Sequence, residues 1–120
     1  MDLGSKILLV EDQLLIAMDA EAILNDHGYH NITTATNLDE ARKVVESQDL
    51  SLVILDINLG GVTSYELASE LVTKNIPFAF ASGYDNHEAQ DYSLEHIPVI
   101  RKPFGEADLL GAISRLIDGQ

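Results

Sequence analysis

The chain has 120 residues, of which 46% are hydrophobic and none is cysteine, and a length of this order is typical of one domain with a single hydrophobic core. Apolar residues occur along the whole chain, which excludes a disordered protein, and no apolar run approaches the roughly 20 residues that a membrane-spanning helix needs. Twenty acidic residues against seven basic residues give a formal net charge of -13, and so negative a surface repels nucleic acid and anionic lipid.

The N-terminus and the absence of cysteine bear on location and on metal binding. The first residues lack the basic end, apolar stretch and cleavage site of a secretory signal, so we expect a cytoplasmic protein. Without cysteine there are no disulfides or thiolate sites, and any metal must be bound by oxygen or imidazole. No linker, repeat or low-complexity segment interrupts the chain, so we expect residues 1–120 to form one domain without an output domain.

Short apolar runs alternate with segments of helical periodicity along the chain. The expected strands are, in chain order, residues 7–10, 31–35, 52–55, 78–81 and 99–100. The apolar side chains expected to share one face of each helix are Leu15, Met18 and Ala22, then Leu38, Ala41 and Val45, then Leu67, Leu71 and Val72, and finally Leu109, Ile113 and Leu116. Strands that alternate with helices predict an α/β fold, a five-stranded parallel doubly wound sheet of flavodoxin-like order 2-1-3-4-5.

Local signals mark several helix ends. Gly28 is a stop for the first helix, and the order of residues 37–40 is typical of a capping box that begins the second. Residues 63–66 can cap the third helix in the same way. The segment 83–96 contains few apolar residues, so the helix expected there is short or loose.

Polar side chains follow four of the five expected strands. Glu11 and Asp12 follow the first strand, Asp56 the third, Ser82 the fourth and Lys102 the fifth. Ligands of parallel sheets bind beyond the carboxyl ends of the strands, where the strand order reverses. With the order 2-1-3-4-5 the first and third strands are neighbours, so we expect Asp12 and Asp56 to lie close together.

Three carboxylates at this edge predict a cation site. Two of them about 4 Å apart repel by about 4 kcal/mol at an effective dielectric constant near 20, and Mg²⁺ relieves this repulsion while keeping positions open for phosphate oxygens. Asp56 is then a candidate nucleophile for a phosphoryl group, Lys102 a cation that neutralises the transferring charge, and Ser82 a hydroxyl donor to a phosphoryl oxygen.

Each of these residues alone also has a structural explanation. Asp12 taken alone is a helix N-cap, and Asp56 alone is a turn former at the end of a strand. Ser82 with Gly83 is a common turn pair, and a lysine before a proline commonly ends a strand. Their joint placement after four strands favours the functional interpretation.

The same residues resemble the motifs of receiver domains of two-component response regulators, and the resemblance extends from Lys6 to the final helix. The matching motifs are Val10-Glu11-Asp12, Asp56-Ile57-Asn58-Leu59, Ser82 and Lys102-Pro103-Phe104. The resemblance implies a Mg²⁺ site formed by the acidic pair, Asp56 and the backbone carbonyl of Asn58. It also implies phosphorylation of Asp56 by a histidine kinase or phosphotransfer protein, and a cis peptide bond before Pro103.

Three positions depart from that family's usual pattern. Gly60 and Ser64 occupy positions where the family usually has proline and glycine, so the acceptor loop is expected to be more mobile. Val99 replaces the usual switch aromatic. Residues 77–84 instead resemble a subgroup named for its Phe-Ala-Thr-Gly-aromatic signature, often stand-alone receivers of alphaproteobacteria, with Ser82 in place of threonine.

We therefore predict a single-domain response regulator that signals by conformational change after the fourth strand, with Ser82, Gly83 and Tyr84 as the switch. One alternative is a Mg²⁺-dependent phosphohydrolase of the haloacid dehalogenase type, although Asn58 stands where such enzymes have a second aspartate. Another alternative is a binding module with a vestigial pocket. A nucleotide-binding flavodoxin-like module ranks last, because the chain has no glycine-rich phosphate loop.

Overall fold

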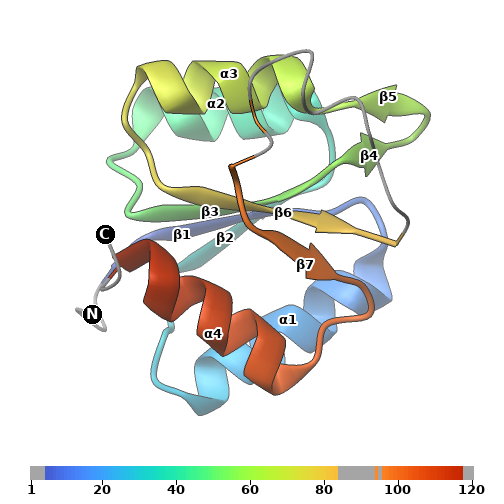
Figure 1. Cartoon of the computed structure of the whole chain (residues 1–120), viewed down its shortest axis with the longest axis vertical. Helices are drawn as coiled ribbons and strands as arrows, with labels where there is room; N and C mark the ends of the chain where they lie inside the picture. The colour runs from blue at the N-terminus through green and yellow to red at the C-terminus, as the bar shows by residue number, and fades with distance from the viewer. Residues whose placement is uncertain (1–4, 84–93, 95, 118–120) are drawn as a thin grey trace.

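A five-stranded parallel sheet lies between two layers of helices (Figure 1). The computed structural model of the chain describes residues 5–83, 94 and 96–117. The strands of this sheet are β1 (Ile7–Val10), β2 (Ile32–Ala35), β3 (Leu52–Asp56), β6 (Phe78–Ser82) and β7 (Val99–Arg101). Within the described residues the helices are α1 (Leu14–Asp26), α2 (Leu38–Ser47), α3 (Tyr65–Thr73) and α4 (Glu106–Ile117). The order β2-β1-β3-β6-β7 confirms the predicted order, because β4 and β5 form a separate hairpin.

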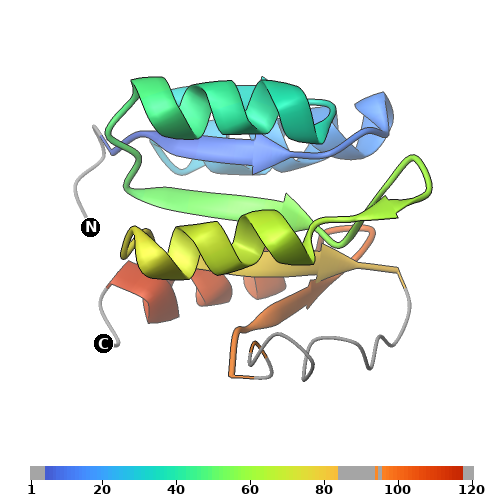
Figure 2. The same ribbon diagram turned by 90° about the horizontal axis from the view of Figure 1, so that it is seen from above.

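The strands in the centre of the sheet are buried on both faces. Leu8 and Val10 pack into the core that includes residues of α2 and α3, whereas Ile7 and Leu9 pack into the core that includes residues of α1 and α4. Figures 1 and 2 show the same pairs of helices on opposite faces of the sheet. Burial on both faces explains why these strands are continuous apolar runs without polar alternation.

The capping signal at the start of α2 is confirmed. The Asn37 side chain accepts a hydrogen bond from the Glu40 N–H at 2.9 Å, and Glu40 Oε1 accepts one from the Thr36 N–H at 2.8 Å. Ala41 and Val45 are buried, as their spacing predicted. The helix therefore begins where the local capping signal predicts.

The buried face of α1 differs from the prediction. Leu15 and Met18 are 76% and 54% exposed, and the buried residues of this helix are Ala17, Ala20 and Leu24. The predicted and the observed buried residues both have helical spacing. Because α1 is apolar on most of its surface, periodicity alone does not distinguish the two faces. The packed face is the one that carries two small alanines and Leu24, which belong to the core shared with α4.

Two later helices follow the predicted pattern with one exception. In α3, Leu67 and Leu71 are buried, but Val72 is 44% exposed. In α4, Leu109 and Ile113 are buried, and the partly buried Leu116 packs against the same core.

A hairpin that the sequence analysis did not predict follows β3. Its strands are β4 (Asn58–Leu59) and β5 (Val62–Thr63), paired antiparallel. The two residues between them, Gly60 and Gly61, have φ angles of 61° and 93°, which glycine adopts without the strain that a Cβ would cause. The loop that follows Asp56 is thus a regular hairpin, and its mobility stays a prediction.

Most of the segment 83–96, including Tyr84, lies outside the described residues. Among the helices in the described part of the chain, none has the length and apolar character of a membrane span.

Candidate functional site

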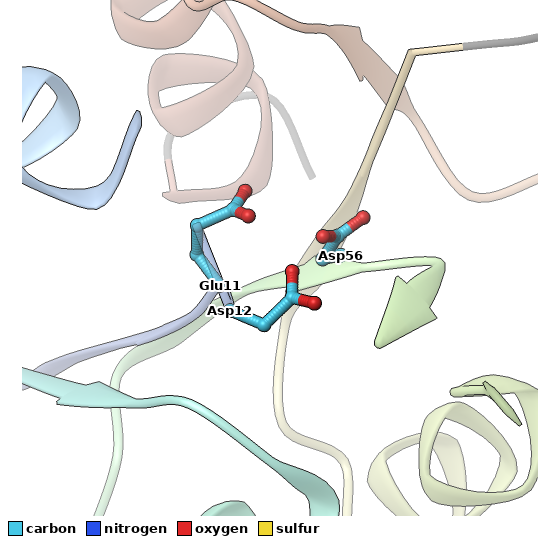
Figure 3. A group of neighbouring side chains, drawn as sticks. All are labelled: Glu11, Asp12 and Asp56. Carbon is cyan, nitrogen blue, oxygen red and sulfur yellow. The ribbon is translucent and has the colours of Figure 1, made fainter. Parts of the chain in front are cut away.

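Three carboxylates converge at the carboxyl ends of β1 and β3. These strands are neighbours in register, with Val10 opposite Leu55, so the residues that follow them meet at one edge. Glu11, Asp12 and Asp56 each place a carboxylate oxygen within 4.8 Å of the others (Figure 3). The predicted proximity of Asp12 and Asp56 is confirmed.

Lys102 bridges two of these carboxylates. Its Nζ donates to Asp56 Oδ2 at 2.9 Å and to Glu11 Oε1 at 3.0 Å. The lysine comes from the segment after β7 and is joined to Pro103 by a cis peptide bond, as the family resemblance implied. One ammonium cannot neutralise three carboxylates, so the cluster keeps a net negative charge that favours a further cation.

Burial shifts the pKa of two carboxyls of the cluster. The side chains of Glu11 and Asp56 are almost inaccessible to solvent, and this burial raises the pKa of both carboxyls, offset only in part by hydrogen bonds, including those from Lys102. Burial is the largest single influence on Lys102 and would lower its pKa. The hydrogen bonds with Asp56 and Glu11 and the attraction to their charges together outweigh burial, so the pKa of the ammonium is raised. Removal of Lys102 would leave two buried carboxylates without their shared partner.

Asp12 is exposed and does not act as a helix cap. The N-cap residue of α1 is Gln13, and its side chain makes no capping hydrogen bond. Asp12 Oδ2 instead accepts a hydrogen bond from the Gly60 N–H at 3.1 Å, which joins the end of β1 to the turn of the β4–β5 hairpin. The plain capping explanation for Asp12 is therefore wrong.

A cavity of about 340 Å³ opens beside the carboxylates. Its lining residues include Asp12, Asp56, Asn58 and Lys102. Carboxylate and carbonyl oxygens are the ligands that Mg²⁺ prefers, and Mg²⁺ uses one or two carboxylates with several water positions. The donor set fits that ion. The Asn58 N–H donates to Asp56 Oδ1 at 3.3 Å, while its carbonyl as a ligand stays a prediction.

Ser82 lies beside the site at the end of β6. It is 3% exposed, and its backbone carbonyl accepts a hydrogen bond from the Lys102 N–H at 3.0 Å. Ser82 is not among the residues that line the cavity, whereas Gly83 is. The structure thus brings Glu11, Asp12, Asp56 and Lys102 together directly, while the predicted switch residue Tyr84 lies outside the described residues.

The Ser64 side chain contacts Asp56, and this contact was not predicted from the sequence. Its Oγ donates to the backbone carbonyl of Asp56 at 2.7 Å. The available signal was a hydroxyl residue at a position where the family usually has glycine. A serine at this position indicates a departure from the family pattern, but the sequence does not show which carbonyl its hydroxyl contacts.

A second cavity, of about 470 Å³, lies away from the carboxylates. It adjoins the amino end of β6, and its lining includes Asn75, Pro77, Pro98 and Arg115. None of its described lining residues is acidic, so it offers no comparable metal site.

The fold and the site together define a class of protein. A parallel sheet that places an acidic pair after its first strand, an aspartate after its third and a lysine before a cis-proline after its last is the arrangement of a receiver domain. The sequence pattern of the response regulator receiver domain family matches residues 7–114. The chain belongs to this family of two-component signalling proteins.

Relatives and solved structures agree with this assignment. The chain is 32% identical over 119 residues to the phyllosphere-induced regulator PhyR of Methylorubrum extorquens, covering 97% of this chain and 45% of PhyR. It is 35% identical over 106 residues to the aerobic respiration control protein ArcA of Escherichia coli K12, covering 86% of this chain and 44% of ArcA. The chain thus spans about half the length of these curated relatives. The solution structure of SdrG from Sphingomonas melonis superimposes with a TM-score of 0.83 at 34% identity, covering 97% of this chain and 98% of SdrG.

Proposed function

We propose that this receiver domain accepts a phosphoryl group on Asp56 in a Mg²⁺-dependent reaction. The observation that carries the proposal is the position of the Asp56 carboxylate. It lies within 4.8 Å of oxygens of Glu11 and Asp12 and accepts a hydrogen bond from Lys102 at 2.9 Å. A nucleophile, a divalent-cation site and a fixed ammonium are the parts that phosphoryl transfer to a carboxylate requires.

The residues have separate roles in this reaction. Glu11, Asp12 and Asp56 would hold Mg²⁺, and the ion would neutralise negative charge on the phosphoryl oxygens. An Asp56 carboxylate oxygen attacks the phosphorus, the bond from phosphorus to the donor breaks, and the donor atom leaves with the electron pair. Lys102 is positioned to move its hydrogen bond from Asp56 to the new phosphoryl group. The product is an aspartyl phosphate.

The donor we propose is a histidine kinase or a histidine phosphotransfer protein. An exposed apolar surface on α1 supports a protein donor. Leu14 is 69% and Leu15 76% exposed, and these two residues lie in sequence between Gln13 and Ile16, which line the cavity. Clustered exposed apolar side chains commonly mark protein contacts. The negative charge of the chain makes nucleic acid an unfavourable partner.

Exposure to acetyl phosphate and Mg²⁺ followed by intact-mass measurement tests the proposal. Wild type should gain the mass of one phosphoryl group, and Asp56→Asn should gain none because its amide is not a nucleophile. Asp49→Asn, at an exposed site on the loop before β3, is the control and should react like wild type. Full modification of Asp56→Asn would contradict the assignment of the acceptor.

The two alternatives predict other outcomes. A phosphohydrolase would turn over phosphoester substrates many times per molecule, and Asn58 lacks the carboxylate that would act as its general acid. A module with a vestigial pocket would show no covalent phosphate in wild type at any Mg²⁺ concentration.

A further inference from the structure

Ser64 ties two consecutive carbonyls of the acceptor segment to the start of α3. Its Oγ donates to the Asp56 carbonyl at 2.7 Å, and its N–H donates to the Ile57 carbonyl at 2.9 Å. Ser64 is fully buried, with 0% exposed. Both contacts lie where the chain leaves β3 and enters the β4–β5 hairpin, so they fix the backbone on which the acceptor carboxylate stands.

The hydroxyl of Ser64 donates its hydrogen bond to Asp56 and does not cap its own helix. A serine at the N-cap ordinarily accepts a hydrogen bond from an N–H in the first helical turn. Ser64 is the N-cap residue of α3, yet its side chain makes no capping bond. Only the contact with Asp56 depends on the side chain, since any residue other than proline would keep the N–H that donates to the Ile57 carbonyl.

We propose that Ser64 is a positioning residue that acts through Asp56, holding its backbone so that the carboxylate faces Lys102 and the acidic pair. This inference rests on the proposed phosphorylation of Asp56.

The peptide unit between Asp56 and Ile57 has two restraints: the Ser64 hydroxyl at its carbonyl, and the Ala81 carbonyl, which accepts a hydrogen bond from the Ile57 N–H at 3.0 Å. Loss of the hydroxyl leaves one restraint and allows this unit to tilt, which changes the backbone torsion at the Cα that carries the carboxylate. The next peptide unit keeps its restraint, because the Ser64 N–H still donates to the Ile57 carbonyl at 2.9 Å. A tilt at Asp56 therefore moves its carboxylate relative to the Asn58 N–H, which lies 3.3 Å from Asp56 Oδ1.

Ser64→Ala removes the hydroxyl and keeps the backbone N–H. With saturating Mg²⁺ and increasing acetyl phosphate, we expect the maximal rate of phosphorylation to fall on the order of tenfold, because misplaced reacting groups lose rate steeply. The acetyl phosphate concentration at half-maximal rate should change much less. Glycine is the usual residue at this position in the family, so Ser64→Gly provides the same comparison if Ser64→Ala does not fold.

Leu71→Val is the matched control for a loss of stability in the same helix. Leu71 is fully buried in α3, and removal of one methylene lowers stability without removing a hydrogen bond to the acceptor. At a temperature well below both melting points, this variant should keep the wild-type maximal rate.

A second readout uses the protein without metal or phosphodonor. In Ser64→Ala the carbonyl carbon resonance of Asp56 should move upfield, because the carbonyl loses its hydrogen-bond donor, and Leu71→Val should leave that resonance in place. A wild-type maximal rate or an unmoved resonance in Ser64→Ala would overturn the proposal, as would an equal loss of rate in Leu71→Val. Wild type that takes no phosphoryl group would instead overturn the proposed function, and this inference with it.

Discussion

Asp56 has a charge that the metal-free fold disfavours. Burial raises the pKa of Asp56 above its usual 3.8 and that of Glu11 above its usual 4.5. In the folded state these carboxyls therefore keep protons at pH values where the unfolded chain has already lost them. Their contribution to the free energy of unfolding is fully present below the usual pKa values and is lost as pH rises through the raised ones.

Asp56→Asn should therefore stabilise the metal-free protein at neutral pH. The amide is neutral and keeps an oxygen for Lys102, so we expect an increase of about 1 kcal/mol in the free energy of unfolding. The difference from wild type should shrink as pH falls below the raised pKa, where Asp56 itself is neutral. Urea unfolding in EDTA across this pH range measures the difference, with Asp49→Asn as the control. Equal or lower stability of Asp56→Asn at neutral pH would show that its charge is not disfavoured.

The residues of the site differ in how well sequence predicts them. Glu11, Asp12, Asp56 and Lys102 could be found because each follows an apolar strand, and parallel strands end at one edge of a sheet. The contact of Ser64 with Asp56 could not be found in this way. It depends on the hairpin that carries the chain back to β3, and the turn geometry of that hairpin is a feature of three-dimensional structure.

Among the elements, α1 shows where periodicity stops being informative. Its residues are apolar on most sides, so two helical stripes compete, and the choice between them depends on packing against the sheet. In α2 the hydrophobic periodicity predicts the buried face correctly, because polar residues occupy the outer face and Ala41 and Val45 are the buried residues. The buried face of an amphipathic helix can therefore be predicted from sequence, whereas the buried face of a helix that is apolar on most sides cannot.

The segment after β6 is the element that we expect to report phosphorylation. Val99 supplies no aromatic ring and is 54% exposed, so the change must begin elsewhere. Phosphate on Asp56 should draw the buried Ser82 hydroxyl toward it by a charge-assisted hydrogen bond, and Gly83, which lines the cavity, should move with it.

Beryllofluoride with Mg²⁺ mimics the phosphorylated state and tests this mechanism by NMR. We expect the amide signals and relaxation dispersion of residues 83–96 to change in wild type. Ser82→Ala should lose this response, whereas the exposed Thr73→Ala on α3 should keep it. Unchanged signals in wild type, or a full response in Ser82→Ala, would favour signalling through α4.

At the scale of the whole molecule, the sheet brings segments far apart in sequence to one point. Lys102 and Glu11 are 91 positions apart in sequence and 3.0 Å apart in space. The strand order that produces this contact was predictable, because alternation of strands and helices permits few topologies. The distances and the burial of each carboxyl were not, since they depend on how the helices pack against the sheet.

Binding of Mg²⁺ to the folded state alone should stabilise the whole molecule. The net charge of -13 and the three clustered carboxylates favour a divalent cation that the unfolded chain cannot hold in one place. At a hundredfold excess over the dissociation constant the gain is about 2.7 kcal/mol, so the melting temperature should rise with Mg²⁺ concentration. The rise should exceed that produced by NaCl of equal ionic strength, which screens charge without occupying the site.

Asp12→Ala should abolish this rise because it removes one carboxylate of the site. The variant also loses the hydrogen bond from the Gly60 N–H to Asp12 Oδ2, which changes the melting temperature without metal. The quantity to compare is therefore the Mg²⁺-dependent rise within each protein, measured by thermal unfolding. Asp49→Ala removes an equal charge from an exposed loop and should keep the wild-type rise. A rise in Asp12→Ala as large as in wild type would place the bound Mg²⁺ elsewhere, and a melting temperature insensitive to Mg²⁺ in wild type would count against the site.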